Sequence, residues 1–413
     1  MPTNYSYLYQ SPDVDEVATA LEMIAADDAA DIRNYYTIRK IVREGLASKY
    51  FDYGDKIVMK WNDGNNHEYD LVWDVVNIAN VVNEAGDTVP GLWLQSHWAL
   101  PGVQFDASEA IYVATSAMSA DKYSFTIGTN WRTHCIADKT YYFTTTQQIP
   151  KGGQIVVGRN NEFYTWGAPD YDPSTWKVFT FASPSSITPL DSNLTVTEGT
   201  GGTNLGTVAS NIVYGTSGPN NLQRAAYGYN RWSQSGLRQW LNSDASVGNW
   251  WKGQNVYDRP PQQLSTMRGF MAGLPDEFVD VVAPVRLTTA LNTVTDSAIG
   301  ESETTVDKFF CASLEQEYIT PQLATVEGPY WPYWKQRMNL GSPQGWYGDN
   351  ANAFHIRYAI ENHTSAQSVR LRSAYRANAY SVWNVNTLGY VSDGVYVSTA
   401  ASALRPAPAC VIC

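Results

Sequence analysis

Residues 370–413 read RLRSAYRANAYSVWNVNTLGYVSDGVYVSTAASALRPAPACVIC. Between Ala377 and Leu404 this stretch contains neither Lys nor Glu, the charged residues that an ordinary surface segment carries. Tyr, Asn, Ser, Asp and Gly are instead spread over a framework of Val, Trp and Ala. Tyr provides a large amphipathic contact area at a small loss of conformational entropy, and Ser, Gly and Asn form adaptable hydrogen bonds. The composition is therefore typical of a recognition surface.

Two interleaved sets of residues make up this segment. The framework set is apolar and strand-forming, and consists of Val382, Trp383, Val385, Val391 and Val397. The second set is predicted to face a ligand, and consists of Asn378, Tyr380, Ser381, Asn384, Tyr390, Ser392, Asp393, Gly394, Tyr396, Ser398, Thr399 and Ser402. Many of these alternate with the framework, as on a strand with one buried face and one presented face. A plain terminal β-hairpin with outward polar residues is the alternative interpretation.

The composition of the whole chain limits the classes of protein that it can be. Its 413 residues are 44% hydrophobic and 16% charged, with 15 Trp, 27 Tyr and a formal net charge of −12. This is the composition of a folded protein of about two or three domains. A nucleic-acid partner is not expected, because phosphate binding needs a basic face. Membrane insertion is not expected either, because no apolar run approaches the length of a membrane span.

The first 49 residues are predicted to be a helical segment. Apolar residues three and four positions apart predict helices from Ser11 to Ile24 and from Asp31 to Ser48. Such a segment suits attachment or oligomerisation, and packing on the protein's own domain is the alternative.

Residues 50–182 are predicted to form an antiparallel β-domain, because the apolar period changes to two at Lys56. The first expected element is a hairpin that turns at residues 62–66. Residues 183–224 are rich in Ser, Thr, Gly and Asn, which predicts a connector. Residues 225–413 then form the last domain, and the fold class predicted for the chain is α+β.

Four patterns in residues 225–413 carry a resemblance to a known family. They are WSQSGLRQWLN at 232–242, VDKFF at 306–310 followed by SLE at 313–315, VRLRS at 369–373, and LRPA at 404–407. In this order they resemble the uncharacterised C-type-lectin-like domains of gut bacteria and their phages. The closing segment also resembles the variable regions that retroelements diversify by mutating template adenines, which change Asn-type codons into Tyr, Ser, Asp, Thr or Gly codons. The resemblance implies a C-type-lectin-like domain at residues 225–413 with a variable ligand-binding segment at 374–404.

The function implied by this resemblance is recognition on a phage or prophage particle. The chain would be a virion protein that binds a host-surface protein or glycan, contacts other virion proteins, and forms a homo-oligomer such as a trimer. It would be made in the bacterial cytoplasm, because the sequence starts without a signal-peptide pattern. The alternatives are a structural virion protein, such as a capsid decoration or fibre component, and an enzyme that acts on glycans.

Metal and cofactor sites are not predicted. Trp61-Asn62-Asp63 matches one element of a lectin calcium site, but the sequence Asn-Asp-Gly explains itself as a hairpin turn. Cys410 and Cys413 have the spacing of a zinc or redox pair, yet no second pair accompanies them. Apolar packing with a free thiol is the expected role of these cysteines.

Catalysis is not predicted either. Glu315 and Glu317 stand in an aromatic stretch, as glycosidase carboxylates do, but nothing else nominates an acid and a nucleophile. Glu315 is expected to hold the fold by pairing with an Arg or a main-chain donor. Arg370, Arg372 and Arg405 are likewise expected to connect irregular loops through hydrogen bonds. The chain is therefore predicted not to be an enzyme.

Overall fold

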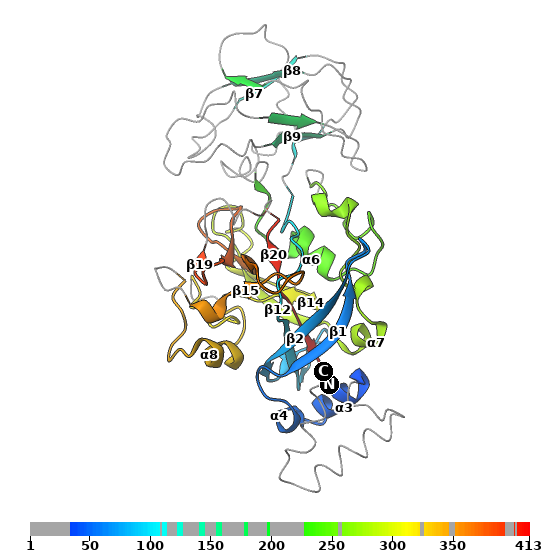
Figure 1. Cartoon of the computed structure of the whole chain (residues 1–413). Coiled ribbons are helices and arrows are strands. Elements are labelled where there is room, and N and C mark those ends of the chain that lie inside the picture. Colours follow the sequence, from blue (N-terminus) through cyan, green and yellow to red (C-terminus); the bar gives the residue numbers. More distant parts are fainter. Residues whose placement is uncertain are drawn as a thin grey trace.

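The computed structural model describes residues 34–107, 227–254, 258–322, 326–346, 352–392, 400 and 403–413, and the main chain of six further strands between residues 110 and 198. Short helices and mostly antiparallel sheets are both present, which confirms the mixed α+β class (Figure 1). The described α-helices are α3 (Tyr35–Arg43), α4 (Ala47–Tyr50), α6 (Gly236–Leu241), α7 (Asp276–Val281) and α8 (Pro332–Met338). The described 3-10 helices are η3 (Trp232–Gln234), η4 (Gln262–Ser265), η5 (Met271–Gly273) and η6 (Ala353–His355).

The helix expected from Asp31 to Ser48 is two helices in the structure. Asn34 caps α3, because its side-chain oxygen accepts a hydrogen bond from the amide of Tyr36 at 2.9 Å. The helix ends before Gly45, whose φ of +73° lies in the left-handed region that stops a helix. The helix expected from Ser11 to Ile24 lies outside the described residues.

A five-stranded sheet lies at the centre of the described fold. Its order is β1 (Lys56–Asn62), β2 (Glu68–Ile78), β5 (Leu92–Ser96), β21 (Pro408–Ile412) and β14 (Phe309–Cys311). β1 and β2 form the antiparallel hairpin that the alternating pattern predicted. Every residue of β5 and of β21 is buried, because both strands lie inside the sheet and packing covers both of its faces.

This sheet joins parts of the chain that the sequence separates into different domains. β5 comes from the first hundred residues and pairs antiparallel with β21 at the end of the chain. In α3, Ile38, Ile41 and Val42 are buried in the same hydrophobic core. The expected boundaries after residue 49 and between residues 182 and 225 therefore do not hold for residues 34–107, which fold together with the C-terminal region.

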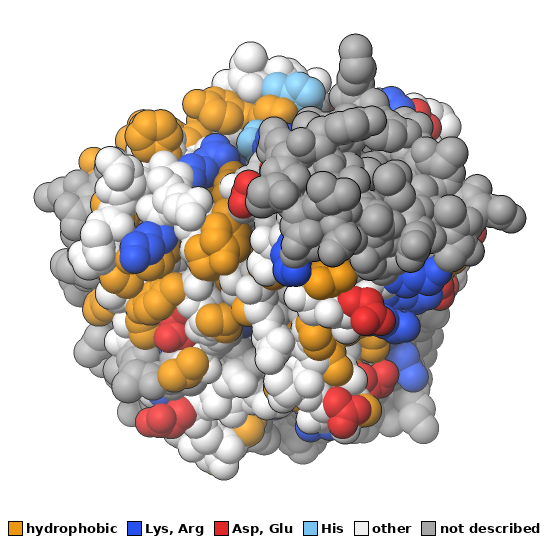
Figure 2. Space-filling model, turned by 90° about the horizontal axis from the view of Figure 1, so that it is seen from below, with side chains coloured by type: hydrophobic (Ala, Val, Ile, Leu, Met, Phe, Trp, Pro, Cys, Tyr) orange, Lys and Arg blue, Asp and Glu red, His pale blue; other side chains and the backbone are white. Residues whose placement is uncertain are grey.

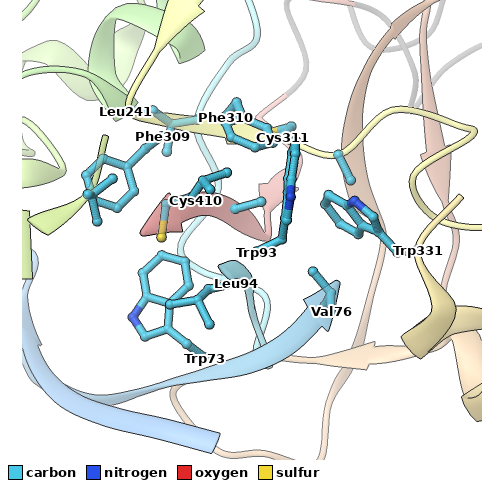
Figure 3. Close-up of a cluster of buried hydrophobic side chains, with 14 of the residues drawn as sticks. Trp73, Val76, Trp93, Leu94, Leu241, Phe309, Phe310, Cys311, Trp331 and Cys410 are labelled. Atoms are coloured by element: carbon cyan, nitrogen blue, oxygen red, sulfur yellow. The ribbon is translucent and has the colours of Figure 1, made fainter. Parts of the chain in front are cut away.

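The core of the fold is aromatic and is built around the central strands. Figure 3 shows Trp73 of β2, Trp93 of β5 and Phe309 of β14 around Cys410 of β21. The ring of Trp73 lies 6.1 Å from the ring of Phe309, in tilted contact. Most of the Trp residues of the chain are therefore buried in the core and do not lie on the surface.

The remaining strands of the described core form smaller sheets. The four-stranded sheet has the order β19 (Val391–Ser392), β18 (Val382–Val385), β17 (Val369–Ala374) and β20 (Arg405–Pro406). The two-stranded sheets are β12 (Val285–Ala290) with β13 (Ser302–Asp307), β15 (Arg357–Tyr358) with β16 (Ala366–Gln367), and β3 (Val81–Val82) with β4 (Thr88–Val89).

Six strands between residues 110 and 198 form two sheets of their own. One has the order β10 (Lys177–Thr180), β9 (Gln154–Gly158) and β6 (Ala110–Val113); the other has β11 (Val196–Glu198), β8 (Thr140–Thr144) and β7 (Lys122–Thr126). Five of these strands, β6 to β10, lie within residues 50–182, where antiparallel β-structure was predicted. Apart from β11, the expected connector at residues 183–224 lies outside the described residues.

The described part of the surface in Figure 2 carries side chains of both charges. On the described part of the face in Figure 2, acidic and basic side chains are interspersed, with hydrophobic side chains between them. Of the helices in the described ranges, none has the length and apolar character needed to cross a membrane.

Candidate functional site

The sequence patterns behind the family resemblance meet in space. Trp232 of η3 donates its indole hydrogen to Asp307 Oδ2 of β13 at 3.0 Å. Arg238 of α6 donates from Nε to the other carboxylate oxygen of Asp307 at 2.6 Å. The segments around residues 232–242 and 306–310 are thereby joined by one buried carboxylate.

Arg372 joins the third pattern to the same framework. Its guanidinium is fully buried and donates to the carbonyl oxygens of Cys311 and Thr288 at 3.1 and 3.2 Å. The neighbouring Ser373 donates to Glu327 Oε2 at 2.6 Å and accepts from the amide of Leu314. The expectation that Arg372 connects irregular loops is confirmed. Burial lowers the pKa of Arg372 by more than the charges of Glu327 and other nearby anions raise it.

Arg405 and Glu315 also have the expected kind of partner. Arg405 pairs with Glu361 at 2.7 Å and donates to the carbonyl oxygen of Leu100. Glu315 accepts from the amide of Glu327, the main-chain donor that the sequence predicted for it. Arg370 is buried beside β14, and burial lowers the pKa of its guanidinium to about 9.

The candidate site is the first part of segment 374–404, at the loop of residues 375–381. The side-chain amide of Asn230 lies within hydrogen-bonding distance of three carbonyl oxygens of this loop, those of Tyr375, Asn378 and Ser381, at 3.2, 2.9 and 2.8 Å. The main-chain amide of Asn230 also donates to the carbonyl oxygen of Ala379. Asn230 thus holds the loop through main-chain atoms, which every residue type carries.

Two further contacts hold the same loop through its main chain. Thr293 donates from its amide and from its hydroxyl to the carbonyl oxygen of Arg376, each at 2.9 Å. The amide of Ala400 donates to the carbonyl oxygen of Tyr380 at 2.7 Å. The carbonyl oxygens of six residues between Tyr375 and Ser381 are therefore hydrogen-bonded to the scaffold. Most of the side chains of these residues take no part in these bonds.

A buried polar network orients Asn230. Its side-chain oxygen accepts from Asn292 Nδ2 at 3.0 Å, so its amide nitrogen must face the loop. Asn292 also donates to Asp296 Oδ2 at 2.8 Å, and Asp296 accepts from the hydroxyl of Tyr229. Asn230, Asn292 and Asp296 are all buried, which makes each of these hydrogen bonds strong and its loss expensive.

Three of the predicted ligand-facing residues are not at the surface. Tyr380, Ser381 and Asn384 have exposed fractions of 6%, 2% and 1%. The ring of Tyr380 lies 4.9 Å from the ring of Tyr227, and Asn384 Nδ2 donates to the carbonyl oxygen of Ser392. The expected alternation fails because packing covers both faces of β18, so all four of its residues are buried.

Three others of the predicted set are partly exposed, namely Asn378, Tyr390 and Ser392. Asn378 uses its side-chain oxygen to accept from the amides of Tyr380 and Ser381, at 3.0 and 2.7 Å, which shapes the loop. The remaining predicted residues lie outside the described ones, and these are Asp393, Gly394, Tyr396, Ser398, Thr399 and Ser402. The structure therefore describes only part of the set of residues predicted to face a ligand.

The framework set behaves as expected where the structure describes it. Val382, Trp383 and Val385 are buried, and Val391 is partly buried against the core. The ring of Trp383 lies between those of Trp346 and Tyr375, at 5.7 and 5.4 Å. Val397 lies outside the described residues.

A tight turn connects β18 to β19. The amide of Gly389 donates to the carbonyl oxygen of Asn386, and the Asn386 side-chain oxygen accepts from the amides of Leu388 and Tyr390. Gly389 has a φ of +80°, and a side chain there would collide with the carbonyl oxygen of Asn352. Only glycine fits this turn as it is packed.

The structure also assembles an aspartate–histidine pair that the sequence did not indicate. Asp74 of β2 is buried, and its Oδ2 lies 2.7 Å from His97 Nδ1 and 2.8 Å from the hydroxyl of Tyr333. Lys56 also bonds to this carboxylate. Burial alone raises the pKa of Asp74, but the bond to His97 and the charge of Lys56 bring it down to about 2.

Such a pair can orient an imidazole for general-base catalysis. Among the described residues, however, no hydroxyl or thiol forms a hydrogen bond with the second ring nitrogen of His97. Asp74 instead joins β1, β2, α8 and the residue that follows β5, and the geometry supports a structural role.

The other carboxylate of the aromatic stretch has different partners from Glu315. Glu317 is buried, accepts from Gln95 Nε2 at 2.6 Å, and lies 2.8 Å from His355 Nε2. Burial by itself raises the pKa of Glu317, whereas the bond to His355 and the charge of Arg357 lower it, and the net shift is downward. Glu315 and Glu317 are thus both buried and bonded to separate partners within the fold.

The two metal-like motifs have local explanations. In Trp61-Asn62-Asp63, the Asn62 side chain accepts from the amide of Gly64 and the Asp63 side chain from the amide of Asn65, as in a hairpin turn. Cys410 is buried in the hydrophobic core, and burial raises the pKa of its thiol. No cluster of three or more potential metal ligands occurs within the described ranges.

Sequence reasoning missed Asn230, Thr293 and Asn292, which fix the candidate loop. Asn230 is a single Asn in the run Tyr227-Gly-Tyr-Asn-Arg231, and nothing in that run distinguishes a buried side chain from an exposed one. Its role depends on a loop 145 residues further along the chain.

Part of the chain matches a known family model. Residues 208–412 match the model of a family described as a domain of unknown function, DUF6273. No curated protein and no solved structure matches the chain. The matched region contains the patterns that carry the resemblance, but not β1, β2 and β5, which complete its sheet.

Proposed function

We propose that this chain is a ligand-binding protein of a phage particle, in which a C-type-lectin-like domain presents exchangeable side chains of segment 374–404 to a host-surface protein or glycan. The scaffold is the buried framework around Asp307, Glu327 and Arg372. The presenting residues are Asn378, Tyr390 and Ser392, with those of the predicted set that lie outside the described residues. Tyr would provide the contact area, and Asn and Ser the hydrogen bonds.

One observation carries this proposal. The scaffold holds the 375–381 loop mainly through carbonyl oxygens, which accept from Asn230, Thr293 and Ala400. A main-chain acceptor is the same for every residue type, so a side chain can change while the bond that fixes the loop is kept. Such an arrangement suits a surface that is diversified in sequence and constant in shape.

Tyr380, Ser381 and Asn384 have a different role in this proposal. Since they are buried, they belong to the framework in this chain. Variation at these three positions would alter packing as well as recognition, and we expect it to be restricted.

A structural virion protein, such as a capsid decoration or fibre component, would use the same fold without a diversified face. A glycan-acting enzyme would need acidic groups that reach a substrate, whereas Glu315 and Glu317 are buried and hydrogen-bonded within the fold. Under the binding proposal, display on a multivalent particle would strengthen attachment, since weak single contacts gain avidity from repetition.

The test is the DNA that flanks the gene. We expect a near-copy of the coding sequence for residues 370–413 beside a reverse transcriptase, with differences at adenines that fall in the codons of the exposed residues. Related strains should vary at Asn378, Tyr390 and Ser392 more than at Val382 and Trp383. Absence of such a copy, together with equal variation at both groups of codons, would overturn the proposed diversification.

A further inference from the structure

Two stretches of chain connect residues 108–226 to the core, and both contact segment 374–404. The first arm is residues 100–107, which lead into this region, and the second arm is residues 227–230, which lead out of it. Each arm therefore connects residues 108–226 to the candidate binding segment as well as to the core.

The first arm runs along the end of the segment. The amide of Val103 donates to the carbonyl oxygen of Leu404 at 3.2 Å, and the amide of Asp106 donates to that of Ala400 at 3.0 Å. The order of the residues is opposite in the two stretches, so they lie antiparallel. The amide of Ala400 in turn donates to the carbonyl oxygen of Tyr380 at 2.7 Å. Ala400 thus connects the first arm to the loop of residues 375–381.

The second arm closes a ring of contacts with the first. The amide of Tyr229 donates to Asp106 Oδ2 at 3.0 Å, which joins the two arms. The ring of Tyr227 lies 4.9 Å from the ring of Tyr380, which joins the second arm to the loop. Four pieces of chain, which together form the junction, meet here: both arms, the loop and Ala400.

The junction is buried, and its centre has no room for a side chain. Asp106, Tyr227, Tyr380 and Ala400 have exposed fractions of 5%, 2%, 6% and 0%. Gly228 has a φ of +80°, and a Cβ there would lie 2.6 Å from the carbonyl oxygen of Asp106 and 3.1 Å from the Cβ of Ala400. The carbonyl oxygen belongs to the main chain and cannot rotate away, so glycine fits this position. Because Gly228 touches the first arm and Ala400 together, a change in the spacing of the arms also displaces Ala400.

We infer that the junction couples the two arms to segment 374–404, so that the spacing of the arms sets how firmly the segment is held. A contact on residues 108–226 that draws the arms apart would release Ala400 and, through it, the carbonyl oxygen of Tyr380. A ligand that holds the segment would in turn hold the arms together, because coupling between two sites is reciprocal. The statement about a ligand rests on the proposed function, whereas the coupling of the arms to the segment does not.

Hydrogen exchange of single amides in the full chain, without any ligand, tests the coupling. The Gly228→Ala variant places a methyl group against Asp106 and Ala400 and forces the arms apart. Protection of the Asp106, Tyr229 and Ala400 amides should fall roughly tenfold relative to the amides of β21 in the central sheet. The matched control is Gly248→Ala, because Gly248 also has a positive φ, of +85°, but no atom lies within 4 Å of its added Cβ. The control should leave the three amides within about twofold of the unaltered chain.

A second variant approaches the junction from the segment. Tyr380→Ala removes the ring that packs on Tyr227 and changes no residue of either arm. Protection of the Asp106 and Tyr229 amides should nevertheless fall roughly two- to tenfold, because the arms lose that contact. Tyr390→Ala is the matched control, since it removes a ring from the turn that the Asn386 side chain holds. It should leave the amides of both arms unchanged.

Three results would overturn the inference. One is unchanged protection of the Ala400 amide in Gly228→Ala while the amides of the arms lose theirs. Another is unchanged protection of both arms in Tyr380→Ala. The third is an equal loss at every amide, those of β21 included, which would show a loss of overall stability and no local coupling. The two variants perturb opposite sides of the junction, so either suffices if the other fails to fold. Failure of the flanking-DNA test would leave the coupling intact, and absence of the coupling would leave the proposed function standing.

Discussion

The side-chain amide of Asn230 lies where three carbonyl oxygens of the 375–381 loop converge. It is buried, and its own oxygen is held by Asn292. At the scale of single residues, the candidate site therefore depends on a side chain that no ligand would touch. A buried carbonyl oxygen left without a donor costs about 1–3 kcal/mol, and several depend on this one amide.

We predict that Asn230→Ala destabilises the protein by about 2–4 kcal/mol, measured by urea unfolding. The matched control is Asn249→Ala, because Asn249 is exposed and bonds only to its own turn. The control should lie within about 0.5 kcal/mol of the unaltered chain. Equal stabilities of the two variants would show that Asn230 does not hold the loop.

Asp74 gives a prediction about acid. Its folded pKa of about 2 lies below the value of about 3.9 for an unfolded chain, so Asp74 stabilises the fold above pH 4. That contribution, about 2–3 kcal/mol, is lost as the pH falls from about 4 through about 2. Asp74→Asn should flatten the pH dependence of the unfolding free energy in this range. A variant that keeps the full acid sensitivity would contradict the assigned role of Asp74.

At the scale of elements, the turn between β18 and β19 is the tightest constraint on the segment. Gly389→Ala should destabilise the protein by about 1–3 kcal/mol, because it adds strain at positive φ and a collision with Asn352. Gly341→Ala is the matched control, since a side chain there meets no atom within 4 Å. Thermal unfolding of the pair measures the difference, and equal midpoints would contradict the packing of the turn.

The elements show what sequence patterns can and cannot predict. The β1–β2 hairpin follows from local alternation and turn residues, and it is confirmed. The burial of Asn384 could not be predicted, because alternation assumes that one face of β18 is open to solvent. Asn230 could not be predicted either, because its partners lie far away in the sequence.

At the scale of the whole molecule, the fully described part of the chain stops at Ala107 and resumes at Tyr227. The two ends lie together, since Asp106 Oδ2 accepts from the amide of Tyr229 at 3.0 Å. In the described part of the chain, the strands between residues 110 and 198 pair only with one another. The pairing of β5 with β21 was hidden from sequence reasoning because this long stretch separates them.

Two deletions test this organisation. Replacing residues 108–226 by a short Gly-Ser linker should keep the cooperative unfolding of the remaining protein, measured by circular dichroism. A fragment of residues 208–413 should not fold alone, because it lacks β5, the partner of β21. Cooperative unfolding of that fragment would show that the N-terminal strands are dispensable.

The most direct test of the central claim is a comparison of two libraries of the full chain, displayed and challenged with protease. One library randomises the exposed or partly exposed Ala377, Asn378, Tyr390 and Ser392; the other randomises the buried Leu371, Arg372, Ser373 and Trp383. If the main chain holds the segment, most members of the first library resist the protease and few members of the second do. Equally low survival in both libraries would contradict the claim that these side chains are exchangeable on a fixed scaffold.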